Sequence, residues 1–266
     1  MSFAGRILAG AAVIVAPFYV VAEVPRQAFD ADVVFLGEVH DNPTHHAVQA
    51  EWVAALAPKA LVFEMLAPEQ AARVTPDLIG DARSLGDLLE WEASGWPDFA
   101  MYHPIFAAAP EAAIFGAAVP RAAVLGMMDQ DVAASFGPDA DRYGLTFDLP
   151  LGEQQTRESL QMASHCDALP QDMLPMMVDV QRLRDAVIAR VAAEAFALHG
   201  GPVVVITGNG HARLDWGAPA ALALGDGDLR VFALLQSEAG SMPDGGSDLV
   251  LDAPAVDRGD PCDAFR

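Results

Sequence analysis

Short apolar segments that alternate with helix-forming stretches constrain the fold of this chain more than any other feature. The segments are rich in Val, Ile, Leu, Phe and Ala, and turn-forming residues follow most of them. They lie at residues 31–36, 60–65, 112–119, 202–207 and 229–235, with a sixth, shorter one at 249–251. Strands that alternate with helices form a sheet that helices cover on both faces. The sequence therefore predicts an α/β fold with a mostly parallel central sheet flanked by helices.

The stretch at residues 151–198 shows no such strand signal. Its apolar residues lie among polar ones, and Pro170 divides it into two expected helices, the second of them long. We interpret this region as part of a helical insertion or cap in the middle of the chain, at about residues 120–200. From about residue 237 onward, Gly, Ser, Asp and Pro predict a loop-rich tail. Further helices are expected at residues 44–56, 68–74 and 85–93, and from residue 214 onward.

An apolar run at residues 7–22 follows Arg6 near the N-terminus. A basic residue, an apolar run and small residues at its end are typical of a secretory signal peptide, which we expect at residues 1–22. The run is shorter than the roughly 20 residues that a helix needs to cross a bilayer. An uncleaved anchor and a buried first strand are the alternatives. A cleaved signal predicts a periplasmic or secreted protein without a stable membrane anchor, and a single domain at residues 23–266.

The charge balance argues against one class of partner. The chain has 15 Lys and Arg against 37 Asp and Glu, which gives a formal net charge of −22, and Lys59 is its one lysine. Binding to a nucleic-acid backbone depends on a basic surface that releases counterions. We therefore expect no nucleic-acid partner, and we interpret most of the acidic residues as the solvated surface of an exported protein.

The two cysteines, Cys166 and Cys262, allow one pairing. In an oxidising compartment, a disulfide between them would join the tail to the middle of the chain and close a long loop. Two free thiols that are too far apart to bond are the alternative. Their spacing is unlike that of a metal-binding cysteine pair.

A glycine followed three residues later by a histidine occurs at the ends of two expected strands. The first copy runs from Gly37 to His40 and the second from Gly208 to His211. We expect the glycine to allow a sharp exit from the strand, and the histidine to lie at the mouth of the sheet, where ligands bind in such folds. The alternative is that both histidines cap helix starts and bond to the backbone. Two copies at two strand ends favour a functional site.

Two carboxylates accompany these histidines. Glu38 lies inside the first motif, and Glu64 lies at the end of the second apolar segment, where an isolated buried carboxylate would be costly. Histidines and carboxylates that converge at one edge of a sheet can hold Zn, Mn or Fe, or carry out acid–base chemistry. The candidate metal-ligating or catalytic residues are therefore Glu38, His40, Glu64 and His211.

Five segments also carry a family resemblance. They are VVFLGEVHDNPTHH at residues 33–46, LVFEM at 61–65, the aromatic segment at 96–104, QRLRD at 181–185 and VVVITGNGH at 203–211. Together they resemble the ChaN-like haem-binding family, which is related more distantly to the Tiki/TraB metal-dependent hydrolases and the erythromycin esterases. The resemblance implies an α/β fold and haem binding in bacterial iron acquisition, with a tyrosine as iron ligand and histidine in support. No cysteine for lipid attachment is present near the expected cleavage site, unlike in the lipoprotein members.

Carried onto this chain, the resemblance implies a set of haem-binding residues. The iron ligand would be Tyr102, with Tyr143 in reserve, and His40 and His211 would support it. Arg182 is a candidate partner for a haem propionate, because a guanidinium can bind a carboxylate through two hydrogen bonds. The alternatives are that Tyr102 packs in a loop and bonds to the backbone, and that Arg182 belongs to an ordinary salt-bridge surface.

Two functions from different classes follow. The first is a periplasmic haem-binding protein involved in iron or haem acquisition or handling, with haem as its cofactor and a homodimer that shares haem as a further expectation. The second is a metal-dependent hydrolase, in which a divalent transition metal held by the strand-end histidines and glutamates activates water. The resemblance favours the haem-binding function.

Overall fold

The fold is built on one parallel sheet, as the computed structural model shows for residues 23–260 and 262–263. The expected signal peptide at residues 1–22 lies outside the described residues. Six strands pair in the order β3-β2-β4-β1-β5-β6, and every pair is parallel. The strands are β1 (Val33–Glu38), β2 (Ala60–Phe63), β3 (Ala113–Gly116), β4 (Val203–Gly208), β5 (Val231–Glu238) and β6 (Leu249–Ala253). The predicted α/β fold with a parallel sheet is confirmed.

Helices connect and cover the strands. They are α1 (Arg26–Phe29), α2 (Pro43–Leu56), α3 (Pro68–Ala71), α4 (Pro76–Ile79), α5 (Ala82–Leu88), α6 (Trp91–Ser94), α7 (Phe99–Ala108), α8 (Arg121–Gly126), α9 (Val132–Phe136), α10 (Leu151–Ser164), α11 (Leu174–His199), α12 (Asn209–Ala212) and α13 (Ala218–Gly225), with the 3-10 turn η1 (Gln171–Met173). Among the residues that the structure describes, no helix combines the length and the apolar character needed to cross a membrane.

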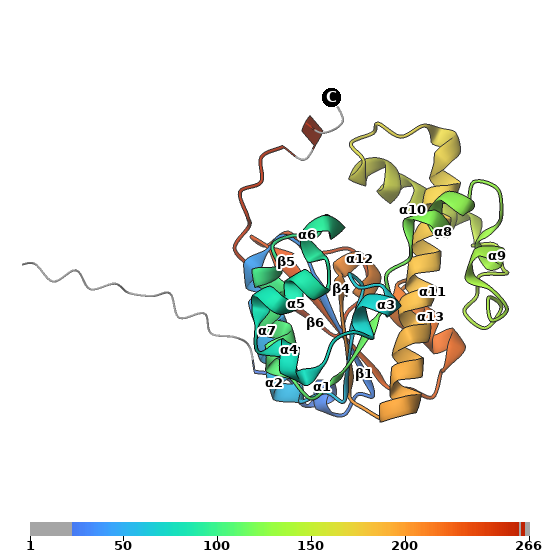
Figure 1. Cartoon of the computed structure of the whole chain (residues 1–266). Helices are drawn as coiled ribbons and strands as arrows, with labels where there is room; N and C mark the ends of the chain where they lie inside the picture. The colour runs from blue at the N-terminus through green and yellow to red at the C-terminus, as the bar shows by residue number, and fades with distance from the viewer. Residues whose placement is uncertain (1–22, 261, 264–266) are drawn as a thin grey trace, which may run out of the picture.

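The core has two halves, one on each face of the sheet. Val34 and Leu36 of β1 belong to the half that contains the apolar residues of α2 and α7. Val33 and Phe35 belong to the half that contains those of α11 and α13. Figure 1 shows these two pairs of helices on opposite sides of the sheet. A strand buried on both faces needs apolar residues at every position, which explains the continuous apolar runs in the sequence.

The middle of the chain contains the two helices expected on either side of Pro170, namely α10 and the long α11. Val180, Leu183 and Ala186 of α11 are buried in the core, and the helix packs against β2, β3 and β4. The long helix is therefore a covering layer of the sheet, and α9 and α10 pack against it (Figure 1).

Two local expectations need correction. Residues 85–93 do not form one helix, because Glu90 has a left-handed backbone conformation (φ 52°) that separates α5 from α6. The aromatic segment at 96–104 is largely helical and not a loop, because α7 starts at Phe99, where Asp98 accepts a hydrogen bond from the Ala100 amide (2.9 Å). Pro104 lies inside this helix.

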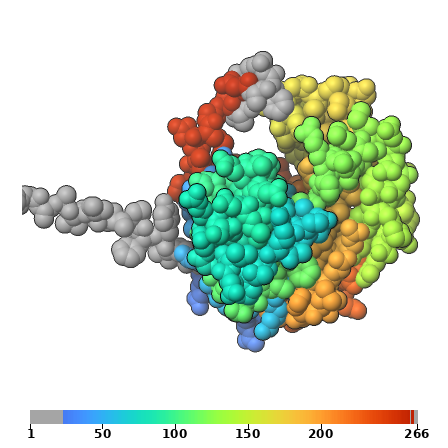
Figure 2. Space-filling view, viewed as in Figure 1, coloured from blue at the N-terminus to red at the C-terminus, as the bar shows by residue number. Residues whose placement is uncertain are grey.

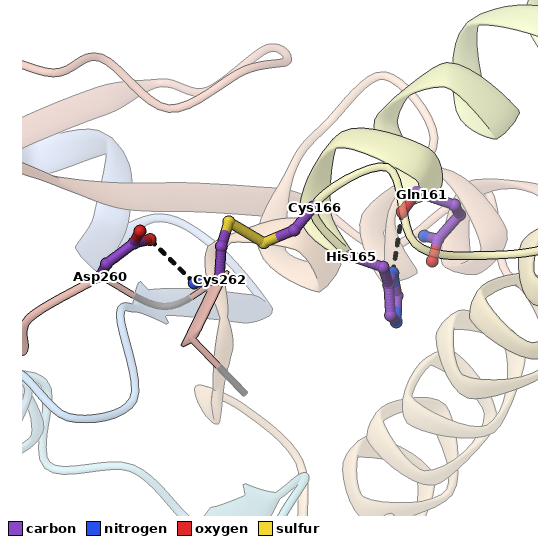
Figure 3. Close-up of a disulfide and its surroundings, with 5 residues drawn as sticks. All are labelled: Gln161, His165, Cys166, Asp260 and Cys262. Atoms are coloured by element: carbon purple, nitrogen blue, oxygen red, sulfur yellow. Dashed lines mark hydrogen bonds between the residues drawn. A yellow bond between two sulfur atoms is a disulfide. The ribbon is translucent and has the colours of Figure 1, made fainter. Parts of the chain in front are cut away.

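The C-terminal tail is tied to the middle of the chain by a disulfide between Cys166 and Cys262, whose Cα atoms are 5.5 Å apart. Figure 3 shows Cys166 at the end of α10 and Cys262 on the tail. Of the two alternatives for these cysteines, the structure has the bonded one. Arg258 holds the tail a second time, through ion pairs with Asp41 (2.8 Å) and Glu238 (2.7 Å).

The connections create a crevice between β1 and β4. The strands are neighbours, and Glu38 at the end of β1 lies opposite Gly208 at the end of β4. The chain leaves β1 toward β2 through α2 on one face, and leaves β4 toward β5 through α13 on the other face. Connections that diverge in this way open a space beyond the carboxyl ends of the two strands, where ligands bind in parallel α/β sheets.

Candidate functional site

A pocket of about 570 Å³ lies at this crevice. We call it the strand-end pocket. Residues at the carboxyl ends of β1, β2, β3 and β4 and one face of α11 line it: Glu38, Val39, His40, Glu64, Trp96, Ala117, Ala118, Val119, Gln181, Arg184, Gly208, Asn209, Gly210 and His211. In Figure 2 an opening separates the red tail from the teal and yellow parts of the molecule. The structure thus brings together the four residues that the sequence placed at strand ends.

Glu38 organises one side of the pocket. Its side chain is fully buried, and Oε1 accepts hydrogen bonds from the Tyr102 hydroxyl (2.9 Å) and from Nδ1 of His40 (2.8 Å). His46 Nδ1 lies 3.3 Å from Oε2, while its Nε2 donates to the carbonyl of His40 (2.8 Å). These contacts fix the His40 imidazole with Nε2 free to meet a ligand, and the Trp96 ring lies beside it at 4.8 Å between centroids.

The charge state of His40 follows from these neighbours. Burial alone lowers its pKa, but the hydrogen bond that His40 donates to Glu38 and the negative charges of Glu64 and Glu38 outweigh burial and raise the pKa above its ordinary value. A carboxylate that accepts from one ring nitrogen also strengthens the other nitrogen as an electron-pair donor. His40 is therefore a positioned imidazole at the pocket wall.

Glu64, His211 and Asp185 organise the other side. Glu64 Oε2 accepts hydrogen bonds from the Thr207 hydroxyl (2.6 Å) and the Gly208 amide (2.9 Å). His211 Nδ1 donates to Asp185 Oδ1 (2.6 Å), and its Nε2 lies 3.7 Å from Glu64 Oε1. The imidazole of His211 thus lies between two buried carboxylates.

This arrangement favours the charged forms of both groups. Burial alone would lower the pKa of His211, but the charges of Glu64 and Asp185 raise it to about 9. Burial would raise the pKa of Glu64, but the positive charges of His211 and His40 and two hydrogen bonds hold it below its ordinary value. At neutral pH the pocket therefore contains ionised Glu64 beside protonated His211.

Tyr102 is at the site but behind its wall. Its side chain is 0% exposed on α7, and its hydroxyl donates to Glu38 (2.9 Å). Burial, with the nearby charge of Glu38, raises the pKa of the phenol far above its ordinary value. The hydroxyl would have to leave Glu38 to meet a ligand in the pocket. Its role as iron ligand stays a prediction.

The structure does not bring Tyr143 or Arg182 to the strand-end pocket. Tyr143 is buried in the half of the core that contains the apolar residues of α8, α9 and α11, where burial raises its pKa. Arg182 pairs with Asp179 (2.9 Å) and donates to the carbonyls of Gly144 (3.0 Å) and Phe147 (2.7 Å). A helix turns by about 100° per residue, so Arg182 faces the loop before α10.

Three residues of the site lie in segments that carry the family resemblance, yet they were not among the candidate site residues. Trp96 packs on His40 and Arg184 lines the pocket, while Asp185 lies behind His211 and pairs with it. Within the described part of the chain, the Arg184 guanidinium has neither a hydrogen bond nor an ion pair. The signal that could have found it is its spacing from Gln181, because residues three apart share a helix face.

The two motif glycines serve a different purpose from the one expected. Neither Gly37 nor Gly208 has a positive φ, so neither makes a turn that other residues would avoid. A Cβ atom on Gly208 would lie 3.0 Å from Nε2 of His40, and one on Gly37 would lie 2.5 Å from Oδ1 of Asn209. Both glycines therefore allow close packing of side chains around the pocket.

Across residues 23–260 and 262–263, no group of three or more His, Cys, Asp and Glu side chains is arranged to hold a metal ion. The four expected ligands instead form two separate units. Glu38 is occupied by His40 and Tyr102, and Glu64 by Thr207 and Gly208.

Comparisons with known proteins find similar solved structures and a matching family. A structure described as cofacial haem binding to ChaN of Campylobacter jejuni matches with a TM-score of 0.65 and 20% identity, over 85% of this chain and 88% of that chain. A structure of the type III effector HopBA1 matches with a TM-score of 0.45 and 14% identity, over 85% and 89%. No curated protein sequence matches. The sequence model of the family described as haem-binding uptake, Tiki superfamily, ChaN matches residues 24–222, most of the chain, and this protein therefore belongs to that family.

Proposed function

We propose that this protein binds haem in the strand-end pocket and takes part in the acquisition or handling of haem iron. Family membership supports this, and so does the size of the pocket. Pockets of roughly 300–1,000 Å³ are usual for cofactors and other small ligands. The pocket also offers groups of the kinds that haem uses, namely an imidazole, an indole ring and a free guanidinium.

The imidazole of His40 is the observation that carries the proposal. Haem iron commonly takes a histidine nitrogen as an axial ligand. Glu38 accepts from Nδ1 (2.8 Å), which fixes the ring and leaves Nε2 as the donor atom at the pocket wall. Trp96 would pack beside a bound ring system, and Arg184 would neutralise a carboxylate of the ligand. The chemistry that haem would supply is that of its iron, which the protein would bind and shield.

The role of tyrosine is a separate part of the proposal. Tyr102 reaches the same carboxylate as His40, so a small movement of α7 would exchange the bond to Glu38 for one to a ligand. Tyr143 lies apart from the pocket and would act as a ligand only in another arrangement. Replacing each tyrosine by phenylalanine separates these roles.

Titration of the purified protein with hemin, followed by absorption spectroscopy, tests the proposal. We expect a one-site binding curve. His40→Ala should lower the affinity for hemin at least tenfold, and His199→Ala, a change at an exposed histidine at the C-terminal end of α11, should leave it unchanged. A ferric tyrosinate spectrum that Tyr102→Phe abolishes would add that residue as a ligand. No spectral change with hemin would contradict the proposal.

Export from the cytoplasm belongs to the same proposal. The apolar N-terminal run has the pattern of a signal peptide, and the disulfide is of a kind that persists in oxidising compartments. Mass spectrometry of the protein recovered from the periplasm should therefore show an N-terminus near residue 23. Size-exclusion chromatography with and without hemin should show whether a homodimer shares the ligand.

A hydrolytic function is the second candidate, because His211 is held between Asp185 (2.6 Å) and Glu64 (3.7 Å) at the pocket. Such carboxylate–histidine pairs position an imidazole for acid–base chemistry. With a pKa of about 9, however, His211 is protonated at neutral pH and suits stabilising negative charge better than accepting a proton. Elemental analysis that finds a stoichiometric transition metal, together with hydrolysis of p-nitrophenyl acetate that His211→Ala abolishes, would favour this function over haem binding.

A further inference from the structure

A second pocket adjoins the strand-end pocket. It has a volume of about 250 Å³ and lies among α10, α11 and α12. We call it the side pocket. Arg157 and Trp216 line it, and it shares Gln181, Asn209 and Gly210 with the strand-end pocket. The two pockets therefore share part of their walls.

Arg157 of α10 is an incompletely satisfied cation in the wall of the side pocket. Its side chain is 11% exposed, and Nη2 pairs with Glu153 one turn earlier. Its Nε atom is buried and has no hydrogen-bond partner within the described residues. Leaving a buried charged donor without an acceptor is costly, so such a group points to an acceptor that a ligand supplies.

The surroundings hold this guanidinium in place. The ring of Trp216 contacts two guanidinium groups, with the Cζ of Arg157 at 4.8 Å and the Cζ of Arg213 at 3.8 Å from its centroid. Arg213 already makes two hydrogen bonds to Asp215, at 2.6 and 2.7 Å. The two arginines therefore differ, because Arg213 has its carboxylate within the protein and the Nε of Arg157 has no acceptor.

The acidic residues of the side pocket do not fill this role. Asp185 is bonded to His211 (2.6 Å), and Asp244 is an exposed residue of the loop between β5 and β6. The amide of Gln181, which lines both pockets, has no hydrogen bond among the residues described. The unused groups that line the side pocket thus include the Nε donor of Arg157 and the amide of Gln181, which together suit an anionic oxygen ligand.

We propose that the side pocket is a carboxylate subsite, in which Arg157 binds an acidic arm of the ligand held in the strand-end pocket. The proposal rests on the proposed function, and the ligand class it names is a planar cofactor that carries carboxylate side chains. For haem, one propionate would pass Gln181 and reach Nε of Arg157, while Arg184 lies in the strand-end pocket for the other. This assigns the two arms of one ligand to two different arginines.

Binding of hemin and of hemin dimethyl ester, in the same mixed solvent, tests the subsite. The ester keeps the iron and the ring but has no carboxylates. We expect the wild-type protein to bind hemin at least tenfold more tightly than the ester. Arg157→Gln should weaken hemin binding roughly tenfold and leave ester binding unchanged, whereas Arg83→Gln, at an exposed arginine of α5, should change neither.

A second variant distinguishes a loss of the subsite from a loss of folding in Arg157→Gln. Glu153→Gln removes the competing partner of Arg157 and should tighten hemin binding, without effect on the ester. Equal affinities for hemin and its ester, with no effect of either variant, would overturn the subsite while leaving haem binding intact. No binding of hemin to the wild-type protein would instead remove the proposed function itself, and the subsite with it.

Discussion

The disulfide between Cys166 and Cys262 should contribute a large part of the stability of this protein. It closes a loop with a sequence separation of 96 residues. In the chain-entropy model, a cross-link that closes about 100 residues destabilises the unfolded state by about 4.7 kcal/mol. This free energy applies if the tail keeps its native position when the disulfide is removed. We expect that it does, because the ion pairs of Arg258 with Asp41 and Glu238 hold the tail independently of the disulfide.

The double variant Cys166→Ser/Cys262→Ser should therefore unfold with a free energy lower by about 4 kcal/mol in urea titrations followed by circular dichroism. The wild-type protein, once a reductant has opened the disulfide, should have the same unfolding free energy as the double variant. Adding Arg258→Ala should cost more in the double variant than in the disulfide-bonded protein, because the ion pairs then hold the tail alone. A loss below about 1 kcal/mol, with the tail still protected from proteolysis, would refute the argument from loop entropy.

Three further variants test the geometry of the site and its support. In metal-free and haem-free protein, Asp185→Asn should lower the unfolding free energy at pH 6 by part of the roughly 3 kcal/mol that the raised pKa of His211 represents, because Glu64 supplies the rest of that shift. The loss should be much smaller at pH 10, because a pKa of about 9 against an ordinary 6.5 stabilises the folded state below pH 6.5, and this stabilisation is lost as the pH rises through 9. Urea titrations at both pH values measure the loss, and a loss independent of pH would contradict the argument. Gly208→Ala should weaken hemin binding, because its methyl group would lie 3.0 Å from Nε2 of His40, and it should lower the unfolding free energy by about 1 kcal/mol. An unchanged affinity for hemin would argue against His40 as a ligand. Asn42→Ala should lower the unfolding free energy measured by calorimetry by about 2 kcal/mol, since Asn42 caps α2 and also binds Glu238 and the tail. A loss of only a few tenths of a kcal/mol would show that these hydrogen bonds contribute little.

The sheet could be predicted from the sequence because its strands are buried on both faces. Such strands need apolar residues over most of their length, as at residues 33–36 and 203–206, and the glycine–histidine motifs mark where these two strands end. The break at Glu90 could not be predicted, because a glutamate has no preference for the left-handed conformation that it adopts. The α7 helix could not be predicted either, because a proline such as Pro104 marks a helix end in most sequences, yet here it lies inside the helix.

The site residues that directly follow strands could be predicted from the sequence. Those that reach the site only through the packing of other helices could not. His40 and His211 follow strands, so the topology brings them to one edge of the sheet. Asp185 lies 26 residues before His211 on another element, and only the packing of α11 against β4 places them together. Tyr102 was found by resemblance, but its bond to Glu38 depends on the angle at which α7 meets the sheet.

The strand-end pocket concentrates positively charged groups within an acidic protein. The chain has a formal net charge of −22, which at long range repels an anionic ligand. The pocket nevertheless contains Arg184, and His211, whose pKa is raised to about 9, adds positive charge there. The buried carboxylates of Glu64 and Asp185 favour the protonated form of His211, and they also cancel part of its charge beyond the pocket. Affinity for an anion therefore depends on contacts made within the pocket, well inside one Debye length of about 10 Å.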